Sequence, residues 1–112
     1  MKTQKKPSNR LVSYEDGLTE RLKDPGYAAE YLNAHLDDPD DFDQEAFLLA
    51  LRDVAVAYGV TRLSKKTKLG RESLYKTLSK KGNPKVSTLT QLLKSLGMKL
   101  SVETQHKKAS GI

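Results

Sequence analysis

The sequence predicts an all-α protein of five to six helices with one short β-strand near its C-terminus. Apolar residues recur at intervals of three and four through most of the chain, and apolar and polar residues alternate near the C-terminus, at 98–103. A chain of 112 residues suits one such domain. We divide it into a basic tail (1–13), an acidic helical extension (14–42), a helical domain that includes the strand (43–103) and a loose tail (104–112).

Charge is segregated along the chain. The net charge is +6, but residues 1–13 carry +4, residues 14–53 carry −9 and residues 54–112 carry +11. An acidic segment repels nucleic acid and attracts a basic partner, whereas a basic segment attracts phosphates. Two solvated faces without partners are the alternative explanation, and charge alone does not decide between them.

Composition excludes several classes of protein. The chain has no cysteine and only two histidines, His35 and His106, and it contains no glycine-rich phosphate loop or nucleophile elbow. We therefore expect no enzyme, no cofactor and no metal site. No apolar run approaches the roughly 18 residues that span a membrane, and no apolar region follows the basic start as in a secretory signal. We expect a cytoplasmic protein that does not bind membranes.

Two short helices are predicted in the acidic extension. Leu18 and Leu22 share a face in the first helix. Asp24 followed by Pro25 is typical of an N-cap with proline at the first helical position. The second helix is expected to run to about Leu36.

The acidic run DDPDDFDQE (37–45) raises the question of a calcium site. An EF-hand loop that began at Asp41 would need glycine at its sixth position and glutamate at its twelfth. Ala46 and Arg52 stand there. We therefore favour a role for these acids at the start of the next helix, where negative charge is stabilising.

A long helix is predicted from Asp43, its N-cap, to about Tyr58, with Gly59 ending it. Phe42 and Phe47 have the spacing of a hydrophobic staple across this cap. Its expected buried face consists of Phe47, Leu51, Val54, Ala55 and Tyr58.

A last helix and a strand are predicted after residue 86. Ser87 is the expected N-cap and Gly97 the stop, with a stripe of Leu89, Leu92, Leu93 and Leu96 between them. The strand presents Met98, Leu100 and Val102 on one face. A lone strand needs a partner, so we expect it to pair with a second copy or with another protein.

The stretch "TRLSKKTKLGRESLYKTLSKKGNP" (61–84) predicts a helix-turn-helix. It holds eight Lys or Arg and one acidic residue, yet it keeps leucines at the spacing of a buried helix face. Thr61 and Gly70 are the expected N-caps of its two helices. The buried or small positions that the motif requires are filled by Leu63, Ser64, Leu69, Leu74 and Leu78.

The second helix of this motif offers candidates for contact with double-stranded DNA. Arginine bonds guanine in bidentate fashion, glutamate accepts from cytosine, and serine or tyrosine donates to bases or phosphates. Arg71 and Lys76 are the principal expected base contacts. The base-contact candidates are Arg71, Glu72, Tyr75, Lys76 and Ser79, and the phosphate-contact candidates are Arg62, Lys65, Lys80, Lys81 and Lys85.

The chain resembles a known family over about residues 14–103. From Gly59 to Val102 it resembles the Xre/Cro-type helix-turn-helix domain, and "RESLYKTLSKKGNPKVSTLTQLLKSLGMKLSV" resembles addiction-module antidote proteins of the HigA type. "YEDGLTERLKDPGYAAEYLNAHL" is similar to their N-terminal extension. Two positions depart from the pattern: Lys68 occupies the usual turn glycine and Gly70 the usual serine or threonine cap. A left-handed lysine would cost on the order of 1 kcal/mol.

The resemblance implies a bacterial antitoxin that neutralises a RelE-superfamily ribonuclease toxin and represses its own operon. The acidic half would mask the phosphate-binding surface of the toxin. The candidate toxin contacts are Tyr27, Glu30, Tyr31, Asp37 and Asp38.

The predicted strand has two candidate partners within this scheme. We favour pairing of two copies about a two-fold axis through Met98, Leu100 and Val102, which would give a homodimer. Extension of a sheet in the toxin is the alternative. A free-standing transcriptional regulator without a toxin and an inhibitor that does not bind DNA are the alternatives to the scheme as a whole.

Overall fold

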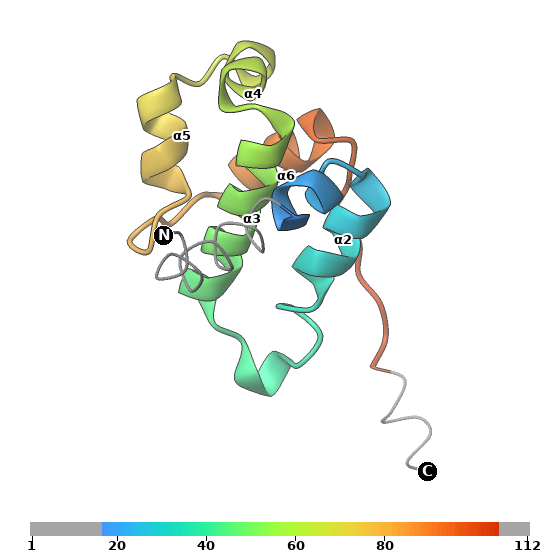
Figure 1. The fold of residues 1–112 in the computed structure, drawn as a ribbon. Coiled ribbons are helices and arrows are strands. Elements are labelled where there is room, and N and C mark those ends of the chain that lie inside the picture. The colour runs from blue at the N-terminus through green and yellow to red at the C-terminus, as the bar shows by residue number, and fades with distance from the viewer. Residues whose placement is uncertain (1–16, 106–112) are drawn as a thin grey trace, which may run out of the picture.

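The computed structural model describes residues 17–105, and all regular structure in that range is helical (Figure 1). The all-α class is therefore confirmed for the described residues. Residues 17–22 are helical and precede the other elements. These are α2 (Pro25–Asn33), the 3-10 helix η1 (Pro39–Asp41), α3 (Gln44–Tyr58), α4 (Val60–Thr67), α5 (Arg71–Thr77) and α6 (Val86–Ser95).

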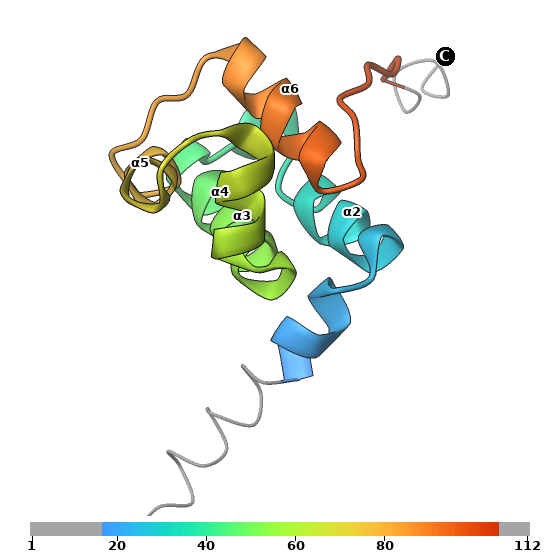
Figure 2. The ribbon, with the colours of Figure 1, turned by 90° about the horizontal axis from the view of Figure 1, so that it is seen from above.

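The central element of the fold is α3 (Figures 1 and 2). It packs against α2 and α4, and α4 in turn contacts α5 and α6. Leu48 and Leu51 of α3 are only 1% and 0% exposed. Full burial of one leucine stabilises a fold by about 1.5–3 kcal/mol, so the buried leucines of α3 contribute strongly to the stability of the core. The predicted buried face is confirmed at Phe47, Leu51, Val54 and Ala55, whereas Tyr58 is half-buried.

The predicted start and end of α3 are confirmed. Asp43 is its N-cap, and a side-chain oxygen of Asp43 accepts a hydrogen bond from the backbone N–H of Ala46 at 3.2 Å. The ring centroids of Phe42 and Phe47 lie 6.2 Å apart across this cap, as expected for a hydrophobic staple. Gly59 ends the helix with a φ of 112°.

The second helix starts where it was predicted but ends earlier. Asp24 caps α2 and accepts from the backbone N–H of Tyr27 at 2.9 Å, with Pro25 at the first helical position. The helix ends at Asn33 because the N–H groups of His35 and Leu36 bond three residues back, which tightens the chain into a turn. Leu36 therefore lies outside the helix and is 40% exposed.

Two predicted N-caps are wrong. α4 begins directly after Gly59, and α6 begins directly after Lys85; neither helix has a side-chain cap. Thr61 and Ser87 consequently lie within the first turns of these helices. The prediction failed because it assumed a side-chain cap at each start, whereas the single residue Gly59, with its positive φ, separates α3 from α4.

The predicted C-terminal strand is absent from the described part of the chain. Residues 98–105 have no regular structure, and no other segment of residues 17–105 forms a strand beside them. Met98 is half-buried and its N–H donates to the carbonyl of Leu93 at 2.7 Å, whereas Leu100 and Val102 are 42% and 97% exposed. Alternating apolar residues do not make a strand without a neighbour that completes the hydrogen bonds.

Candidate functional site

Side-chain hydrogen bonds fix the turn between α4 and α5. The hydroxyl of Ser64 donates to the carbonyl of Leu69 at 2.6 Å, and the hydroxyl of Thr67 donates to the carbonyl of Leu63 at 2.8 Å. From α6, the side-chain amide of Gln91 donates to the carbonyl of Thr67 at 3.0 Å. These bonds connect the turn to α4 and to α6. They therefore fix the direction in which α5 leaves the turn relative to α4.

The apolar positions expected in this helix pair are buried. Leu63, Leu74 and Leu78 are at most 2% exposed, and Leu69 is half-buried against the core. Gly70 is the N-cap of α5, as expected, but offers no side-chain cap. These leucines hold α5 against the core and turn its polar face to solvent.

Lys68 has the left-handed backbone that the sequence analysis anticipated. Its φ is 64° and its ψ is 15°, and within residues 17–105 it is the one non-glycine residue with a positive φ. This conformation costs about 1 kcal/mol for an L-residue. Its N–H donates to the carbonyl of Ser64 at 2.8 Å, which closes α4.

The exposed face of α5 carries most of the base-contact candidates. Arg71, Glu72 and Lys76 are exposed. Tyr75 is 36% exposed and stacks with Arg52 of α3, whose guanidinium carbon lies 5.2 Å from the ring centroid. Ser79 lies beyond the end of α5, half-buried, and its hydroxyl already donates to the carbonyl of Lys76 at 2.8 Å. The structure thus brings four of the five candidates to one helix and engages the fifth in a turn.

The phosphate-contact candidates divide into two groups. Lys65, Lys80, Lys81 and Lys85 are exposed near α5 or on the loop that follows it. The guanidinium of Arg62 stacks on Tyr58, 4.2 Å from the ring centroid, and it borders a cavity of about 460 Å³ that Leu22 and Ala28 also line. Arg62 therefore faces α3 and the N-terminal helices and is separated from the other four.

The loop that carries Lys80, Lys81 and Lys85 is held by contacts that the sequence analysis missed. The side-chain amide of Gln44, at the start of α3, donates to the carbonyl of Gly82 at 3.2 Å. A Cβ on Gly82 would lie 1.9 Å from the carbonyl oxygen of Thr77, so this position accepts glycine alone without movement. The glycine within SKKGNP indicates a turn. No sequence pattern indicates its hydrogen bond to Gln44, which lies 38 residues away.

Tyr58 is a second residue whose surroundings the sequence did not predict. Its hydroxyl is buried and has no hydrogen-bond partner in the described structure. The ammonium of Lys66 lies 5.3 Å from the ring centroid and also donates to the carbonyl of Ser95 at 3.4 Å. The Lys66 ammonium, and secondly the Arg62 guanidinium, hold the pKa of this phenol below its ordinary value of 10.0 although burial acts in the opposite direction.

The candidate toxin contacts do not form one cluster. On α2, Tyr27 accepts a hydrogen bond from Arg21 at 3.0 Å, and Glu30 is exposed. Tyr31 is half-buried and its hydroxyl donates to Asp53 of α3 at 2.7 Å, so it joins α2 to α3. Asp37 and Asp38 lie in the connection between α2 and η1, apart from the residues of α2.

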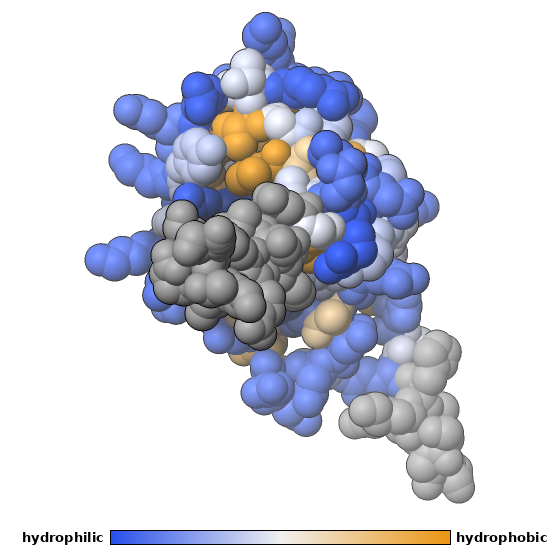
Figure 3. Space-filling model, viewed as in Figure 1, coloured by the Kyte–Doolittle hydropathy of each residue, from blue (hydrophilic) through white to orange (hydrophobic). Residues whose placement is uncertain are grey.

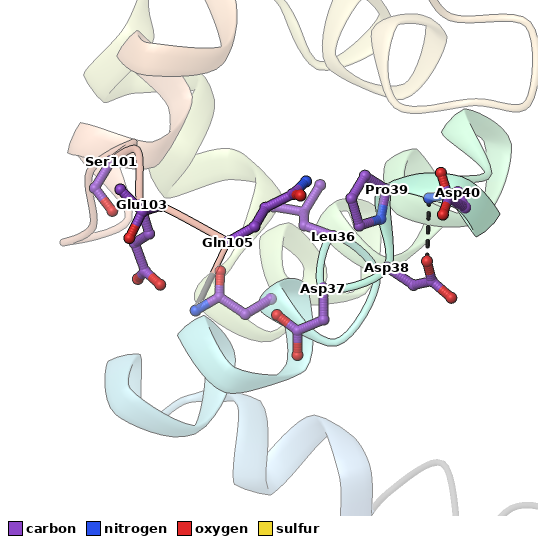
Figure 4. A pocket seen from close by; sticks show the side chains of 10 residues that line it. Leu36, Asp37, Asp38, Pro39, Asp40, Ser101, Glu103 and Gln105 are labelled. Atoms are coloured by element: carbon purple, nitrogen blue, oxygen red, sulfur yellow. Dashed lines mark hydrogen bonds between the residues drawn. The ribbon is translucent and has the colours of Figure 1, made fainter. Parts of the chain in front are cut away.

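An open cleft of about 620 Å³ separates the α2–α3 connection from the C-terminal segment (Figure 4). Asp37, Asp38 and Asp40 lie on one side of it, and Glu103 lies on the other. A side-chain oxygen of Asp38 accepts from the backbone N–H of Asp40 at 3.0 Å, which caps η1 and fixes this side of the cleft. The cleft therefore presents four carboxylates to solvent between two chain segments.

Apolar side chains gather elsewhere on the surface. In the view of Figure 3 the surface is largely hydrophilic, with an apolar patch where α3, α4 and α5 meet. Val56, 46% exposed, and Val60 border this patch beside Tyr75. Among residues 17–105, no group of three or more His, Asp or Glu side chains is arranged to hold a metal ion. None of the described helices combines the length and apolar character needed to cross a bilayer.

Comparison with known proteins identifies the family. A family model described as "Probable addiction module antidote protein" matches residues 14–104. The chain belongs to this antidote family. It is also 33% identical over 95 residues to an uncharacterized protein of Haemophilus influenzae, an alignment that spans 77% of this chain and 95% of that protein. No solved structure matches the chain.

Membership confirms the coarser predictions. The protein is the antidote of an addiction module, its partner is a toxin, and it is not an enzyme. The matched range runs from the N-terminal helices through the cleft to residue 104, so the acidic extension and the C-terminal segment are both parts of the family's domain.

Proposed function

We propose that this antidote binds and neutralises a ribonuclease toxin of the RelE superfamily, and that it represses its own operon through a helix-turn-helix of the Xre/Cro and HigA type. In this proposal α4 and α5 form the DNA-binding unit, and the acidic N-terminal half forms the toxin-binding unit. The observation that carries it is the exposed basic surface formed by α5 and the loop with Lys80, Lys81 and Lys85, at a different end of the molecule from the acidic η1 region (Figure 1).

The dimensions and chemistry of α5 support DNA binding. An α-helix with its side chains is about 10–12 Å in diameter, which fits a major groove about 12 Å wide, and the seven residues of α5 form about two turns. Arg71 and Lys76 are exposed on it and carry the charge and the donors that bond guanine edges. Lys65, Lys80, Lys81 and Lys85 flank the helix and would neutralise phosphates on either side of the groove.

Charge supports the toxin assignment. A ribonuclease must attract RNA phosphates and therefore carries a basic surface, to which an acidic partner is complementary. Residues 14–53 carry a charge of −9, and the exposed carboxylates of Glu30, Asp37 and Asp38 belong to this segment. We place the main toxin contact on this side of the molecule, with Tyr27 at its edge and Tyr31 as a packing residue.

A homodimer would complete the operator-binding unit. The segment around Leu100 and Val102 is exposed, and its backbone groups form no hydrogen bond within residues 17–105, so pairing with a second copy would bury both side chains. Two α5 helices related by a two-fold axis would then read half-sites about 34–36 Å apart. The proposed site of action is the cytoplasm, where operator and toxin meet.

The two units are tested by separate variants of the full chain. We expect Arg71→Ala with Lys76→Ala to abolish binding to the DNA upstream of the antidote's own reading frame, while copurification with the product of the adjacent reading frame is retained. Glu30→Gln with Asp37→Asn and Asp38→Asn should weaken copurification and leave DNA binding intact. Asparagine at position 38 keeps the cap of η1, so the fold is preserved.

Other results favour the alternatives. If the adjacent product does not copurify with the full chain and operator binding persists, the protein acts as a transcriptional regulator rather than through this toxin. If the Arg71 and Lys76 variants leave every activity unchanged, the α4–α5 pair is a scaffold and the protein acts as an inhibitor alone.

A further inference from the structure

The turn between α4 and α5 holds a strained lysine whose side chain has no function within the described structure. Lys68 is exposed and takes the left-handed conformation that glycine adopts without a steric penalty. Among residues 17–105 its ammonium has neither a hydrogen bond nor an ion pair. The fold holds the backbone of this turn, but the described residues give the Lys68 side chain no hydrogen bond or ion pair, which points to a role for that side chain outside the fold.

The surroundings of this turn indicate what the lysine meets. Lys65 lies three residues before Lys68 on α4, and Arg71 lies three residues after it at the start of α5; both are exposed. A Cβ added at Gly70 would have no atom within 4 Å, so the space beside the turn is open at that position. Three cations thus follow one another around an open turn that leads into α5.

We propose that Lys68 is a nucleic-acid backbone contact of this antidote, and that the strain at this position is retained because a glycine would lose the cation. The inference rests on the proposed DNA-binding function. It adds a contact from the turn, between the α4 contact at Lys65 and the base-reading residues of α5. Stability and DNA affinity should then respond to substitution at this position in opposite directions.

Three variants separate charge from strain. Lys68→Gly removes both, and it should raise the melting temperature by a few degrees. Lys68→Asn removes the charge but tolerates the left-handed conformation, whereas Lys68→Arg keeps the charge and the strain. We expect affinity for a fluorescent duplex from upstream of the antidote's own reading frame to fall about five-fold at 0.15 M salt in the glycine and asparagine variants. Lys68→Arg should bind as the wild type does.

The salt dependence distinguishes a contact from a general charge effect. Loss of one phosphate contact lowers the slope of log affinity against log salt by about 0.9. Lys23→Gln is the matched control, because Lys23 is exposed and lies just before α2, which is on the side of the molecule away from α5 (Figures 1 and 2). This control should leave the slope and the affinity nearly unchanged.

Two outcomes would overturn the inference in different ways. If Lys68→Gly raises the melting temperature but leaves affinity and slope unchanged, while Arg71→Ala weakens binding, the DNA-binding proposal stands and Lys68 is no contact. If Arg71→Ala also leaves binding unchanged, the α4–α5 surface does not bind DNA and the inference fails with the proposed function.

Discussion

At the scale of single residues, Tyr58 combines a buried hydroxyl with two cations on its ring. The hydroxyl lacks a hydrogen-bond partner in the described structure, while Arg62 and Lys66 both lie over the aromatic ring. Burying an unpaired hydroxyl costs about 1–3 kcal/mol, which the cation–π contacts offset in part. The ring therefore contributes stability and the oxygen removes some of it.

Tyr58→Phe separates these two contributions. We expect the variant to be as stable as the wild type at neutral pH, or more stable by about 1 kcal/mol, because it keeps the ring and removes the unpaired oxygen. Urea unfolding monitored by circular dichroism measures the difference. Tyr58→Ala is the control and should destabilise the fold by several kcal/mol, about 3–5 for loss of a packed aromatic side chain. A strongly destabilised Tyr58→Phe would show that the hydroxyl has a partner in solution.

The pKa of Tyr58 adds a dependence on pH. Because Lys66 and Arg62 lower the pKa of the folded phenol below 10.0, ionisation favours the folded state. This stabilisation is complete above the unfolded pKa and is lost as the pH falls through the folded pKa. Relative to Tyr58→Phe, the wild type should gain stability as the pH rises through that window. An unchanged difference between the two proteins across alkaline pH would contradict this assignment.

At the scale of elements, the loop after α5 depends on one glycine and one distant amide. We expect Gly82→Ala to destabilise the fold by about 1–3 kcal/mol, because the new Cβ would collide with the carbonyl of Thr77. It should also weaken DNA binding, since the loop would carry Lys80 and Lys81 away from α5. Melting temperature and DNA affinity are the two measurements.

Gly70→Ala is the matched control for this loop. Gly70 has a negative φ of −68° and open space where a Cβ would lie, so alanine there should cost much less stability. Equal losses in the two variants would show that loss of glycine, rather than the Thr77 contact, is responsible.

The elements also show which kinds of feature a sequence predicts. Asp43, Phe47 and the leucines of α3 act within one turn of the chain, so their caps and burial followed from spacing alone. The bond from Gln44 to Gly82 joins residues 38 positions apart, and no local pattern encodes it. The predicted strand is absent for the same reason. A strand depends on pairing with a distant segment, and residues 17–105 do not supply one.

The exposure of the candidate site was predictable to a similar extent. Arg71, Lys76 and the lysines of the loop were selected by their charge in and beside the predicted helix pair, and the structure leaves them exposed, while their contact with DNA stays a prediction. Arg62 has the same residue type and the same charge, yet it stacks on Tyr58 and faces the N-terminal helices. Residue type and spacing do not distinguish a solvated cation from one that packs on an aromatic ring.

At the scale of the whole molecule, opposite charges lie on different elements. Among the described residues the acidic ones lie mainly between positions 20 and 53, on α2, η1, α3 and the segments that join them, whereas α4, α5 and the following loop are basic. In Figure 1 η1 lies at one end of the molecule and α5 lies near the other. A polyanion can therefore approach α5 from the side away from η1, although the start of α3 contacts the loop after α5 through the bond from Gln44 to Gly82.

The separation of charge leads to a quantitative expectation for DNA binding. With Arg62 engaged on Tyr58, the cations proposed to contact the DNA backbone are Lys65, Lys68, Lys80, Lys81 and Lys85. If all five neutralise phosphates, affinity for a duplex from upstream of the antidote's reading frame should fall roughly 500-fold between 50 and 200 mM salt. Fluorescence anisotropy titrations across this range measure the slope.

A charge variant on the acidic side tests whether the two ends act independently. Glu30→Gln with Asp37→Asn raises the net charge by two, but these residues lie on α2 and beyond it, away from α5 in Figure 1. Beyond a Debye length of about 8 Å at physiological salt, their effect on DNA affinity is screened. The salt slope should therefore match that of the wild type, whereas Lys80→Gln with Lys81→Gln should lower it by about 1.8. A slope that rises in the acidic-side variant would mean that these carboxylates lie against the bound DNA, and that the two ends do not act separately.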